Sequence, residues 1–313
     1  MDSAVTIKRS MVILLSGASG FIGSRLSRSL RADGGGGGHR VVALTRRAGD
    51  GDSVWWDAAA GRIDVDALAR LRPDVVINLA GENIAQRWTP RRRARIRDSR
   101  VNGTRALAEA LASLAARPRV LVSGSAVGYY GAHRGDEVLD ETSAPGVDFL
   151  GQVAREWERS TDAASAAGIR VVLIRTGVVL GAGGGVLGRV ALPFRAGLGG
   201  RLGDGRQWMS WIAMDDVVRG IRHLAEASTL SGPVNLVAPE PVTNAQFTKI
   251  LAHVLSRPAL FPVPRVALEL LFGTMADNTI LASQRAVPKR IAGDGFAFRH
   301  PLLEDALRSE LRR

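Results

Sequence analysis

Short apolar runs alternate with amphipathic stretches over the first half of the chain. The apolar runs have the length of buried strands and are rich in β-branched residues. The stretches between them repeat apolar residues at helical spacing, and the longest span residues 90–115 and 148–167. Strands that alternate with helices in this way predict an α/β fold with a doubly wound parallel sheet. The expected strands are residues 12–15, 40–45, 74–80, 119–123 and 169–176.

The pattern changes after residue 177, where glycines become frequent and long loops replace the regular alternation. Residues 211–227 return to a helical pattern, and residues 234–238 read as another strand. A further helix begins at Thr243 or Asn244, because either side chain can accept a hydrogen bond from the first free amides of a helix.

This change predicts two interlocked parts. We expect a nucleotide-binding domain of residues 11–176, with residues 211–238 returning to it. A smaller C-terminal substrate lobe would then consist of residues 177–210 and 239–313. The substrate is expected in the cleft between the two parts, where ligand sites commonly lie.

Three glycines at intervals of three residues follow the first expected strand, and a helix starts directly after them. In a strand-to-helix turn, glycines allow a tight bend, close approach of a phosphate and close packing of helix on strand. The bare amides and the positive end of the helix then form an anion site. This context predicts a Rossmann-like domain that binds a dinucleotide, with a purely structural turn as the alternative. The expected cofactor contacts here are Gly17, Ser19, Gly20, Phe21, Ile22 and Gly23.

The end of the second expected strand indicates which dinucleotide is bound. NAD enzymes usually place an acidic residue there, whereas this chain has Thr45, Arg46 and Arg47. A guanidinium group suits the 2′-phosphate of NADP, so we predict NADP, written NADPH when reduced. The alternative is that both arginines are ordinary surface residues.

Other cofactor contacts are expected where further strands end. Leu79, Ala80 and Gly81 follow one strand and should lie under the adenine ribose and pyrophosphate. Val178 and Val179 follow another strand and should flank the nicotinamide. Arg100 lies on the helix after the Ala80 loop and is expected to reach toward the cofactor or substrate.

Composition and charge exclude several classes of protein. The 313 residues include no cysteine, which rules out disulfides and thiolate chemistry, and the histidines show no metal-ligand spacing. No apolar run approaches a membrane span and no signal peptide is evident, so we expect a cytoplasmic protein without a membrane partner.

The formal charge is +12, and the positive residues are densest in residues 91–97. That cluster is expected to be the solvated face of a long helix rather than a nucleic-acid site.

Four motifs together resemble the extended short-chain dehydrogenase/reductase superfamily: GASGFIG at 17–23, NLAGENI at 78–84, SGSAVGYYG at 123–131 and WIAMDD at 211–216. Residues 178–200 and the tail from residue 263 resemble signatures of its atypical, sugar-nucleotide-epimerase-like branch. The resemblance covers nearly the whole chain. It implies an NADP-binding epimerase or reductase that acts on a carbonyl or sugar-like small molecule, as a monomer or homodimer.

The resemblance also reveals an atypical active site. Family members use a serine, a tyrosine that exchanges a proton with the substrate, and a lysine that lowers the pKa of that tyrosine. Ser125 matches the serine, but Phe149 and Val153 stand at the tyrosine and lysine positions. Neither replacement can titrate, so the standard acid/base pair is absent.

Three hypotheses follow from that absence. Tyr129 or Tyr130 supplies the proton, with Ser125 and Glu82 arranging the substrate. Alternatively, the protein binds NADPH without turnover and serves as a sensor or regulatory module. In the third hypothesis a carboxylate, Glu82 or Asp136, performs the proton chemistry.

The positions of several further side chains predict roles in the cleft or at a helix end. Tryptophans and polar groups near the expected cleft are candidates to line it, although tryptophan more often anchors a core. The aspartates 215–216 are expected to cap the helix that follows them. The candidate cleft residues are Glu82, Asn83, Arg87, Trp88, Trp208 and Trp211.

Overall fold

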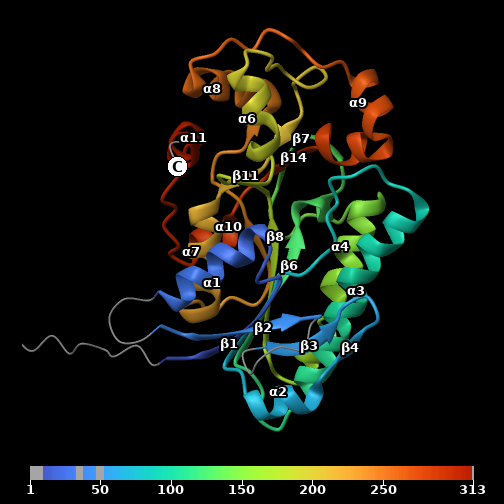
Figure 1. Ribbon diagram of the computed structural model, residues 1–313, viewed down its shortest axis with the longest axis vertical. Helices are drawn as coiled ribbons and strands as arrows, with labels where there is room; N and C mark the ends of the chain where they lie inside the picture. The colour runs from blue at the N-terminus through green and yellow to red at the C-terminus, as the bar shows by residue number, and fades with distance from the viewer. Residues whose placement is uncertain (1–9, 33–37, 47–52, 312–313) are drawn as a thin grey trace, which may run out of the picture.

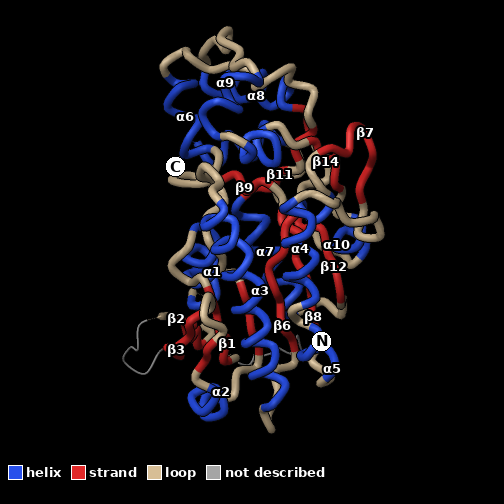
Figure 2. Tube along the Cα trace, turned by 90° about the vertical axis from the view of Figure 1, so that its right-hand side faces the viewer, coloured by secondary structure: helices blue, strands red, loops and turns tan. Residues whose placement is uncertain are grey.

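The computed structural model describes residues 10–32, 38–46 and 53–311. Its centre is an eight-stranded sheet with the order β12-β8-β6-β5-β1-β2-β3-β4 (Figures 1 and 2). Neighbouring strands are parallel except for the β3–β4 pair at one edge. The predicted doubly wound α/β sheet is therefore confirmed. Its strands are β1 (Val12–Ser16), β2 (Arg40–Thr45), β3 (Ser53–Asp57), β4 (Arg62–Ile63), β5 (Val75–Asn78), β6 (Val120–Ala126), β8 (Arg170–Thr176) and β12 (Gly232–Leu236).

Helices cover both faces of this sheet (Figure 1). On one face, Leu26 of α1 and Ile221 of α7 pack in the same apolar cluster as alternate strand residues such as Ile13 and Ile77. On the other face, α2, α3 and α5 pack against the remaining strand residues. The strands read as continuous apolar runs because both of their faces are buried. These helices are α1 (Phe21–Arg31), α2 (Val65–Leu71), α3 (Pro90–Ser113), α4 (Phe149–Arg159), α5 (Asp162–Ala166) and α7 (Met214–Glu226).

Two of the expected helices are divided in the structure. The segment 148–167 forms α4 and α5, which are separated at Ser160, whose hydroxyl donates to the Glu156 carbonyl. The segment 211–227 begins as strand β11 (Trp211–Ala213) and becomes helical only from Met214. Strands β3 and β4 were not expected, because their alternating pattern is short and lies beside glycine-rich sequence.

Most of the rest of the chain is stacked beyond the carboxyl ends of the strands (Figures 1 and 2), whereas residues 289–296 return to the main sheet. It contains short two-stranded pairs, β10–β13, β11–β9 and β14–β7, in place of a second sheet. The capped helix predicted at Thr243 is confirmed, since its hydroxyl accepts from the Gln246 amide. The division into two lobes stays a prediction. Two residues of the tail assigned to the smaller lobe, Ile291 and Phe296, pack in the core of the main sheet.

The elements of this region are all short. They are β7 (His133–Leu139), β9 (Val178–Leu180), β10 (Trp208–Met209), β13 (Val242–Thr243), β14 (Ser283–Ala286), α6 (Leu187–Arg195), α8 (Asn244–Leu255), α9 (Arg265–Phe272), α10 (Lys289–Gly293), α11 (Leu303–Leu311), the 3₁₀ turn η1 (Val127–Tyr130) and the π turn η2 (Ala276–Ile280). Among the described residues, no helix has both the length and the apolar character needed to cross a membrane.

The aspartates at the start of α7 do not cap that helix, which corrects the expectation for residues 215–216. Asp216 is fully buried and accepts hydrogen bonds from the backbone amides of Arg299 and His300, both at 2.8 Å. Asp215 lies near the surface and pairs with the Arg299 side chain at 2.7 Å. Asp216 therefore ties the C-terminal tail to the face of the sheet.

We predict that Asp216→Ala lowers the free energy of unfolding by about 2–4 kcal/mol, because it leaves two buried amides without an acceptor. Urea unfolding followed by circular dichroism measures this. Asp215→Ala is the matched control and should cost less than about 1 kcal/mol, as expected for a partly exposed ion pair. Equal losses of unfolding free energy in the two variants would contradict the role assigned to Asp216.

Candidate functional site

The glycine turn between β1 and α1 is shaped by close backbone contacts. Gly17 has a φ of +70°, which favours glycine, and a Cβ there would lie 3.0 Å from the carbonyl carbon of Leu79. A Cβ at Gly23 would lie only 2.1 Å from the Gly17 oxygen. The first glycine thus lets the ends of β1 and β5 touch, and the third lets α1 pack against the turn.

The amino end of α1 is open toward this turn. Gly20 is the N-cap residue, and no side chain caps the helix. Within the described residues, the backbone amides of Phe21 and Ile22 have no hydrogen-bond acceptor. Free amides at the positive end of a helix are suited to a phosphate.

Several predicted cofactor residues meet beside the turn. Phe21, Ile22, Leu79 and Val179 all pack at the edge of the same core cluster, although they come from three parts of the chain. Val178 belongs to the same strand, β9, which pairs with β11. Ser19 and Gly20 are exposed at the turn itself. The structure therefore brings these residues together at the carboxyl ends of the strands.

A chain of buried hydrogen bonds fixes the end of β5 against the turn. The Ser16 hydroxyl donates to Asn78 Oδ1 at 2.6 Å and accepts from the amides of Leu79 and Ala80 at 3.0 and 3.1 Å. Asn78 Nδ2 in turn donates to the Thr104 hydroxyl, at 2.8 Å. Sequence reasoning missed Ser16, Asn78 and Thr104; the available signal was a polar residue at the end of each of two apolar strands.

The strand end that carries the NADP prediction lies next to the turn. The register pairs Ser16 of β1 with Leu44 of β2, so the following residues, Gly17 and Thr45, are neighbours. Thr45 is half-buried and Arg46 is exposed. Arg47 lies outside the described residues.

A second glycine-rich segment, residues 181–185, closes around Phe21. A Cβ at Gly181, Gly184 or Gly185 would lie 2.6–3.0 Å from the Phe21 ring. The backbone of this segment is held from two sides: the Ala182 amide donates to the buried Glu310 carboxylate at 2.9 Å, and Arg25 donates to the Ala182 carbonyl. In the sequence, these glycines predicted only loops and matched a family signature. Their contact with Phe21 could not be seen there, because Phe21 lies 160 residues before Gly181.

Arg100 lies beside Gly81 at the mouth of the site. A Cβ at Gly81 would lie 3.0 Å from the Arg100 guanidinium carbon, and the same group lies 5.2 Å from the Trp157 ring centre. Burial lowers the pKa of Arg100 to about 10, while Glu82 nearby opposes that effect. Among the described residues, the Ile96 carbonyl, at 3.0 Å, is the one hydrogen-bond acceptor of this guanidinium group. Such a group is well placed to receive an anionic ligand.

The Ser125 side chain takes part in a buried ionic network. Its hydroxyl donates to Glu158 Oε1 at 2.7 Å, and Glu158 also accepts two hydrogen bonds from Arg175, at 2.8 and 2.9 Å. All three residues are buried. The Ser125 hydroxyl is therefore directed to Glu158, and its role toward a substrate stays a prediction.

The two adjacent tyrosines have different surroundings. Tyr130 is fully buried; its hydroxyl donates to Asn235 at 2.6 Å and accepts from Arg175 at 3.2 Å. Both hydrogen bonds of the Tyr130 hydroxyl are thus made within the protein, which makes Tyr130 the less available of the two candidate proton donors. Tyr129 is half-buried, the Arg175 guanidinium carbon lies 3.4 Å from its ring centre, and its hydroxyl has no partner among the described residues.

The replaced tyrosine position has become part of an apolar cluster. The Phe149 ring lies 5.1 Å from the Trp88 ring in an edge-to-face contact, and Arg93 lies over it at 4.4 Å. Val153 is buried. Trp88 is buried and anchors α3, α4 and the tail, which is the alternative to a place in the cleft.

The other cleft candidates divide into core and surface residues. Trp211 is fully buried and belongs to the core, which is the more frequent role of a tryptophan. Trp208 is half-buried and donates to Asp136 at 2.7 Å. Glu82 is half-buried and paired with Arg95 at 3.3 Å. Asn83 and Arg87 are exposed on the loop that follows Glu82.

The basic cluster 91–97 is a solvated helix face, as predicted. Its arginines lie on the exposed side of α3, while Ile96 between them is buried. Arg97 pairs with Glu156 at 2.6 Å and Arg95 with Glu82. These contacts neutralise part of the charge within the protein.

Comparison with known families identifies this arrangement. A model of the NAD dependent epimerase/dehydratase family matches residues 13–236, and a model of a domain of unknown function, DUF1731, matches residues 263–310. The chain belongs to the NAD dependent epimerase/dehydratase family. It is 43% identical over 298 residues to the epimerase family protein Mb2239 of Mycobacterium bovis, covering 95% of this chain and 96% of that relative. It is 33% identical over 301 residues to human SDR39U1, covering 95% of this chain and 99% of the human protein.

Solved structures agree with the family assignment. A crystal structure of human epimerase family protein SDR39U1 with NADPH superposes with a TM-score of 0.85 at 33% identity, over 97% of this chain and all of the human chain. A nucleoside-diphosphate sugar epimerase from Corynebacterium glutamicum gives a TM-score of 0.79 at 37% identity, over 97% of this chain and 58% of its own. The predicted resemblance to the extended short-chain dehydrogenase/reductase epimerases is confirmed.

The buried position of Tyr130 predicts how stability depends on pH. Burial raises its pKa to about 12, so the folded state holds this proton more tightly than the unfolded state does. The resulting stability is present below pH about 10, where an unfolded tyrosine titrates, and is lost as the pH rises toward about 12. We expect wild type to lose about 2 kcal/mol more than Tyr130→Phe over this range, in urea unfolding. Parallel pH profiles for wild type and Tyr130→Phe would contradict the prediction.

Proposed function

We propose that this protein binds NADPH at the turn between β1 and α1. The observation that carries the proposal is the uncapped amino end of α1, where the amides of Phe21 and Ile22 face a turn shaped by Gly17 and Gly23. A diphosphate there would accept hydrogen bonds from main-chain donors and gain from the helix dipole. The similar human protein solved with NADPH supports this choice of ligand.

The preference for NADPH over NADH is assigned to the end of β2. Thr45 and Arg46 lie beside Gly17 in the register of the sheet, where the adenosine ribose of a dinucleotide belongs. A guanidinium group at this place attracts a 2′-phosphate. Leu79, Ala80 and Gly81 would line the opposite side, and Arg100 would approach an anionic oxygen of the cofactor or substrate. The full proposed set also includes Gly17, Ser19, Gly20, Phe21, Ile22, Gly23, Arg47, Val178 and Val179.

We expect Arg46→Ala to weaken NADPH binding by about 1–3 kcal/mol and to leave NADH binding nearly unchanged, because only NADPH carries the 2′-phosphate. Isothermal titration calorimetry with both cofactors measures the difference. Equal losses for the two cofactors would remove the role assigned to Arg46. No heat of binding with either cofactor would overturn the proposed function as a whole.

We further propose an oxidoreductase or epimerase activity on a carbonyl or sugar-like substrate, with Tyr129 as the proton donor. Tyr129 is the phenol of η1 whose hydroxyl stays free among the described residues, and it follows the strand that ends at Ser125 and Ala126. Glu82 and Asp136 remain the carboxylate alternatives. Both already accept a hydrogen bond or ion pair from a neighbour, which makes them less available than Tyr129.

NADPH oxidation with a panel of aldehydes, ketones and keto sugars, followed at 340 nm, tests this activity. We expect Tyr129→Phe to lower the turnover number at least about 100-fold while NADPH affinity is retained, as for loss of a general acid. Phe149→Tyr provides a comparison, because it restores a phenol at the family position without the lysine. Turnover by wild type that survives Tyr129→Phe would exclude Tyr129 and favour a carboxylate.

A second candidate function is that of an NADPH-binding sensor or regulatory module without turnover. The observation that favours it is the loss of the standard pair: Phe149 packs against Trp88, Val153 is buried, and the Ser125 hydroxyl is bound to Glu158. NADPH binding without oxidation by any carbonyl of the panel, unaltered by Tyr129→Phe, would support this alternative.

Three coarser assignments complete the proposal. The substrate lobe is assigned to residues 177–210 and 239–313, beyond the carboxyl ends of the strands. We propose a cytoplasmic location, although a relative from Arabidopsis thaliana is described as chloroplastic. The partner is a small molecule, and the protein is proposed to act as a monomer or homodimer.

A further inference from the structure

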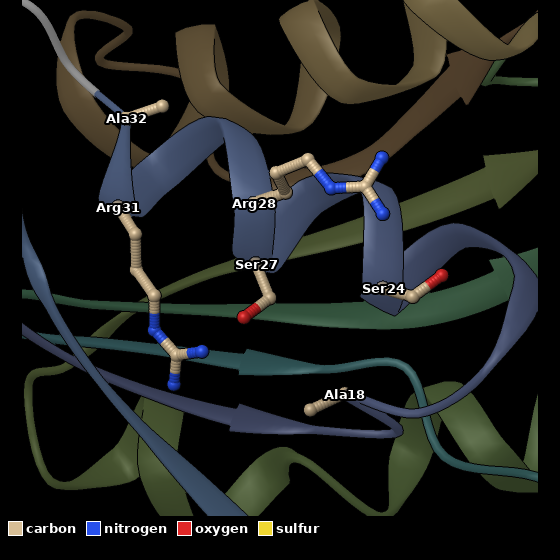
Figure 3. Close-up of a pocket in the computed structure, with 6 residues that line it drawn as sticks. All are labelled: Ala18, Ser24, Ser27, Arg28, Arg31 and Ala32. Carbon is tan, nitrogen blue, oxygen red and sulfur yellow. The ribbon is translucent and has the colours of Figure 1, made fainter.

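A hollow of about 530 Å³ follows α1 beside the glycine turn (Figure 3). Its lining consists of arginine, serine and alanine side chains, and none of these groups exchanges a proton readily near neutral pH. Proton chemistry therefore needs another part of the molecule, and the two phenols of the chain lie in η1, directly after β6. The residues that line the hollow are Ala18, Ser24, Ser27, Arg28, Arg31 and Ala32.

Arg175 is a buried cation beside these phenols. It is 2% exposed, and the register of the sheet pairs it with Ser125 on the neighbouring strand. An arginine is almost never buried to this extent unless its charge is paired. Here the partner is Glu158 of α4, which accepts hydrogen bonds from Nε at 2.8 Å and from Nη2 at 2.9 Å. The pair fixes the position of the guanidinium group between β8 and α4.

The third nitrogen of the guanidinium group is also engaged by the protein. Nη1 donates to the Tyr130 hydroxyl at 3.2 Å and to the Glu141 carbonyl at 3.3 Å. Hydrogen bonds to a guanidinium group lie near its plane, so these bonds and those to Glu158 occupy its edges and fix the orientation of that plane. The flat faces of the group remain available for an aromatic ring.

One of those faces meets Tyr129. The guanidinium carbon of Arg175 lies 3.4 Å from the Tyr129 ring centre, against 5.2 Å from the Tyr130 ring centre. A cation is attracted by the face of an aromatic ring, and more strongly where water is excluded. The Tyr130 ring packs edge-to-face against Tyr129, with ring centres 5.5 Å apart. The Tyr129 ring is thus held by Arg175 and Tyr130.

The contact with Arg175 supplies a positive charge that the family motif places elsewhere. The family lysine would stand on α4 at position 153, where this chain has the buried and uncharged Val153. Arg175 comes from β8 and reaches the candidate phenol from the sheet. Charge pairing with Glu158 accounts for the burial of Arg175, but it does not account for the phenol on its guanidinium face.

We infer that Arg175 is a positioning residue for the proposed proton donor: the face of its guanidinium group holds the Tyr129 ring, and its charge stabilises the phenolate that remains when Tyr129 gives up its proton. The inference rests on the role proposed for Tyr129. It adds to that role the residue that takes over the electrostatic part of the absent lysine. Arg175 acts through Tyr129 and touches neither substrate nor cofactor in this scheme.

The proton balance of the proposed reduction shows where this charge acts. The carbonyl carbon of the substrate gains a hydride from NADPH, and its oxygen gains the proton of the Tyr129 hydroxyl. The products are the alcohol, NADP⁺ and a Tyr129 phenolate, which regains a proton from water. A cation attracts a phenolate more strongly than a neutral phenol, so Arg175 favours the state after proton transfer over the state before it. Glu158, bonded at the guanidinium edge, keeps the cation in place.

The test removes the Arg175 charge without leaving Glu158 unpaired. Arg175→Met alone would leave a buried carboxylate without its counter-charge, so it is combined with Glu158→Gln. The glutamine keeps an oxygen acceptor for the Ser125 hydroxyl. Arg175→Lys is the variant that retains the charge but loses the planar fork.

A matched control removes a similar pair from the far edge of the sheet. Arg62→Met combined with Asp57→Asn removes an ion pair with a nitrogen–oxygen distance of 3.9 Å and a guanidinium group 5.8 Å from the Trp55 ring centre. Circular dichroism and the melting temperature show whether each variant folds.

Two measurements are made on each variant. NADPH oxidation with the carbonyl panel gives the turnover number and KM, and calorimetry gives the NADPH affinity. Tetranitromethane nitrates the phenolate form of tyrosine, so its rate reports the Tyr129 phenolate without any substrate. Peptide mass spectrometry locates the nitrated residue, and the fully buried Tyr130 is expected to stay unmodified.

We expect the uncharged double variant to lower the turnover number about 100-fold, with KM and NADPH affinity within about twofold of wild type. Nitration of Tyr129 should slow about tenfold, as for the loss of a desolvated cation from an aromatic ring. Arg175→Lys should recover most of both rates, because its ammonium group retains the charge. The control at Arg62 and Asp57 should match wild type in both measurements.

Loss of both rates in the uncharged variant, but not in Arg175→Lys or the control, supports the inference. Wild-type turnover and nitration in a folded uncharged variant would mean that the pair is structural alone, and the inference is then wrong. Equal losses in Arg175→Lys and the uncharged variant overturn it too, because the retained charge then has no effect. If wild type oxidises NADPH with no carbonyl, the proposed activity fails and the catalytic part of the inference fails with it, while nitration still decides whether Arg175 acts on the phenol.

Discussion

The contact between the glycine turn and the end of β5 is the constraint on which the proposed cofactor site depends. Gly17 touches the Leu79 carbonyl, and the Ser16 hydroxyl holds the next amides in place. The Asn78 amide then connects this point to Thr104, which also accepts from the Trp157 indole at 2.9 Å. Because every member is buried and satisfied, the network fixes two strand ends and two helices in one geometry. The first amides of α1, which have no acceptor among the described residues, are thereby held toward the proposed cofactor site.

A second buried network determines which groups remain available for chemistry. The Glu158–Arg175 pair has low solvent exposure, and breaking such a pair is costly even where its net contribution to stability is small. The pair binds the Ser125 hydroxyl on one side and the Tyr130 hydroxyl on the other. The Ser125 and Tyr130 hydroxyls, which both belong to the motif at residues 123–131, therefore make their hydrogen bonds within the protein. Tyr129 lies against the same guanidinium group, and its hydroxyl has no partner in the part of the chain that the structure describes.

The sequence was sufficient for the sheet and for the glycine turn, because those features are local. Apolar runs specify buried strands, and the glycine spacing specifies the turn at Gly17. The roles of Ser125 and Tyr130 could not be predicted, since both depend on Glu158 and Arg175, which lie 33 and 45 residues further along the chain, respectively. The enclosure of Phe21 by residues 181–185 was hidden for the same reason. Side-chain partners that are distant in sequence leave no periodic pattern.

The buried Glu310 carboxylate makes the last helix a structural component of the nucleotide end of the molecule. It holds the Ala182 amide from α11, while Phe21 at the start of α1 fills the space inside that glycine segment. Loosening the final turns would release the segment without disturbing any strand of the sheet. Tags or fusions placed directly after α11 are therefore best separated from it by a flexible spacer, so that this carboxylate keeps its place.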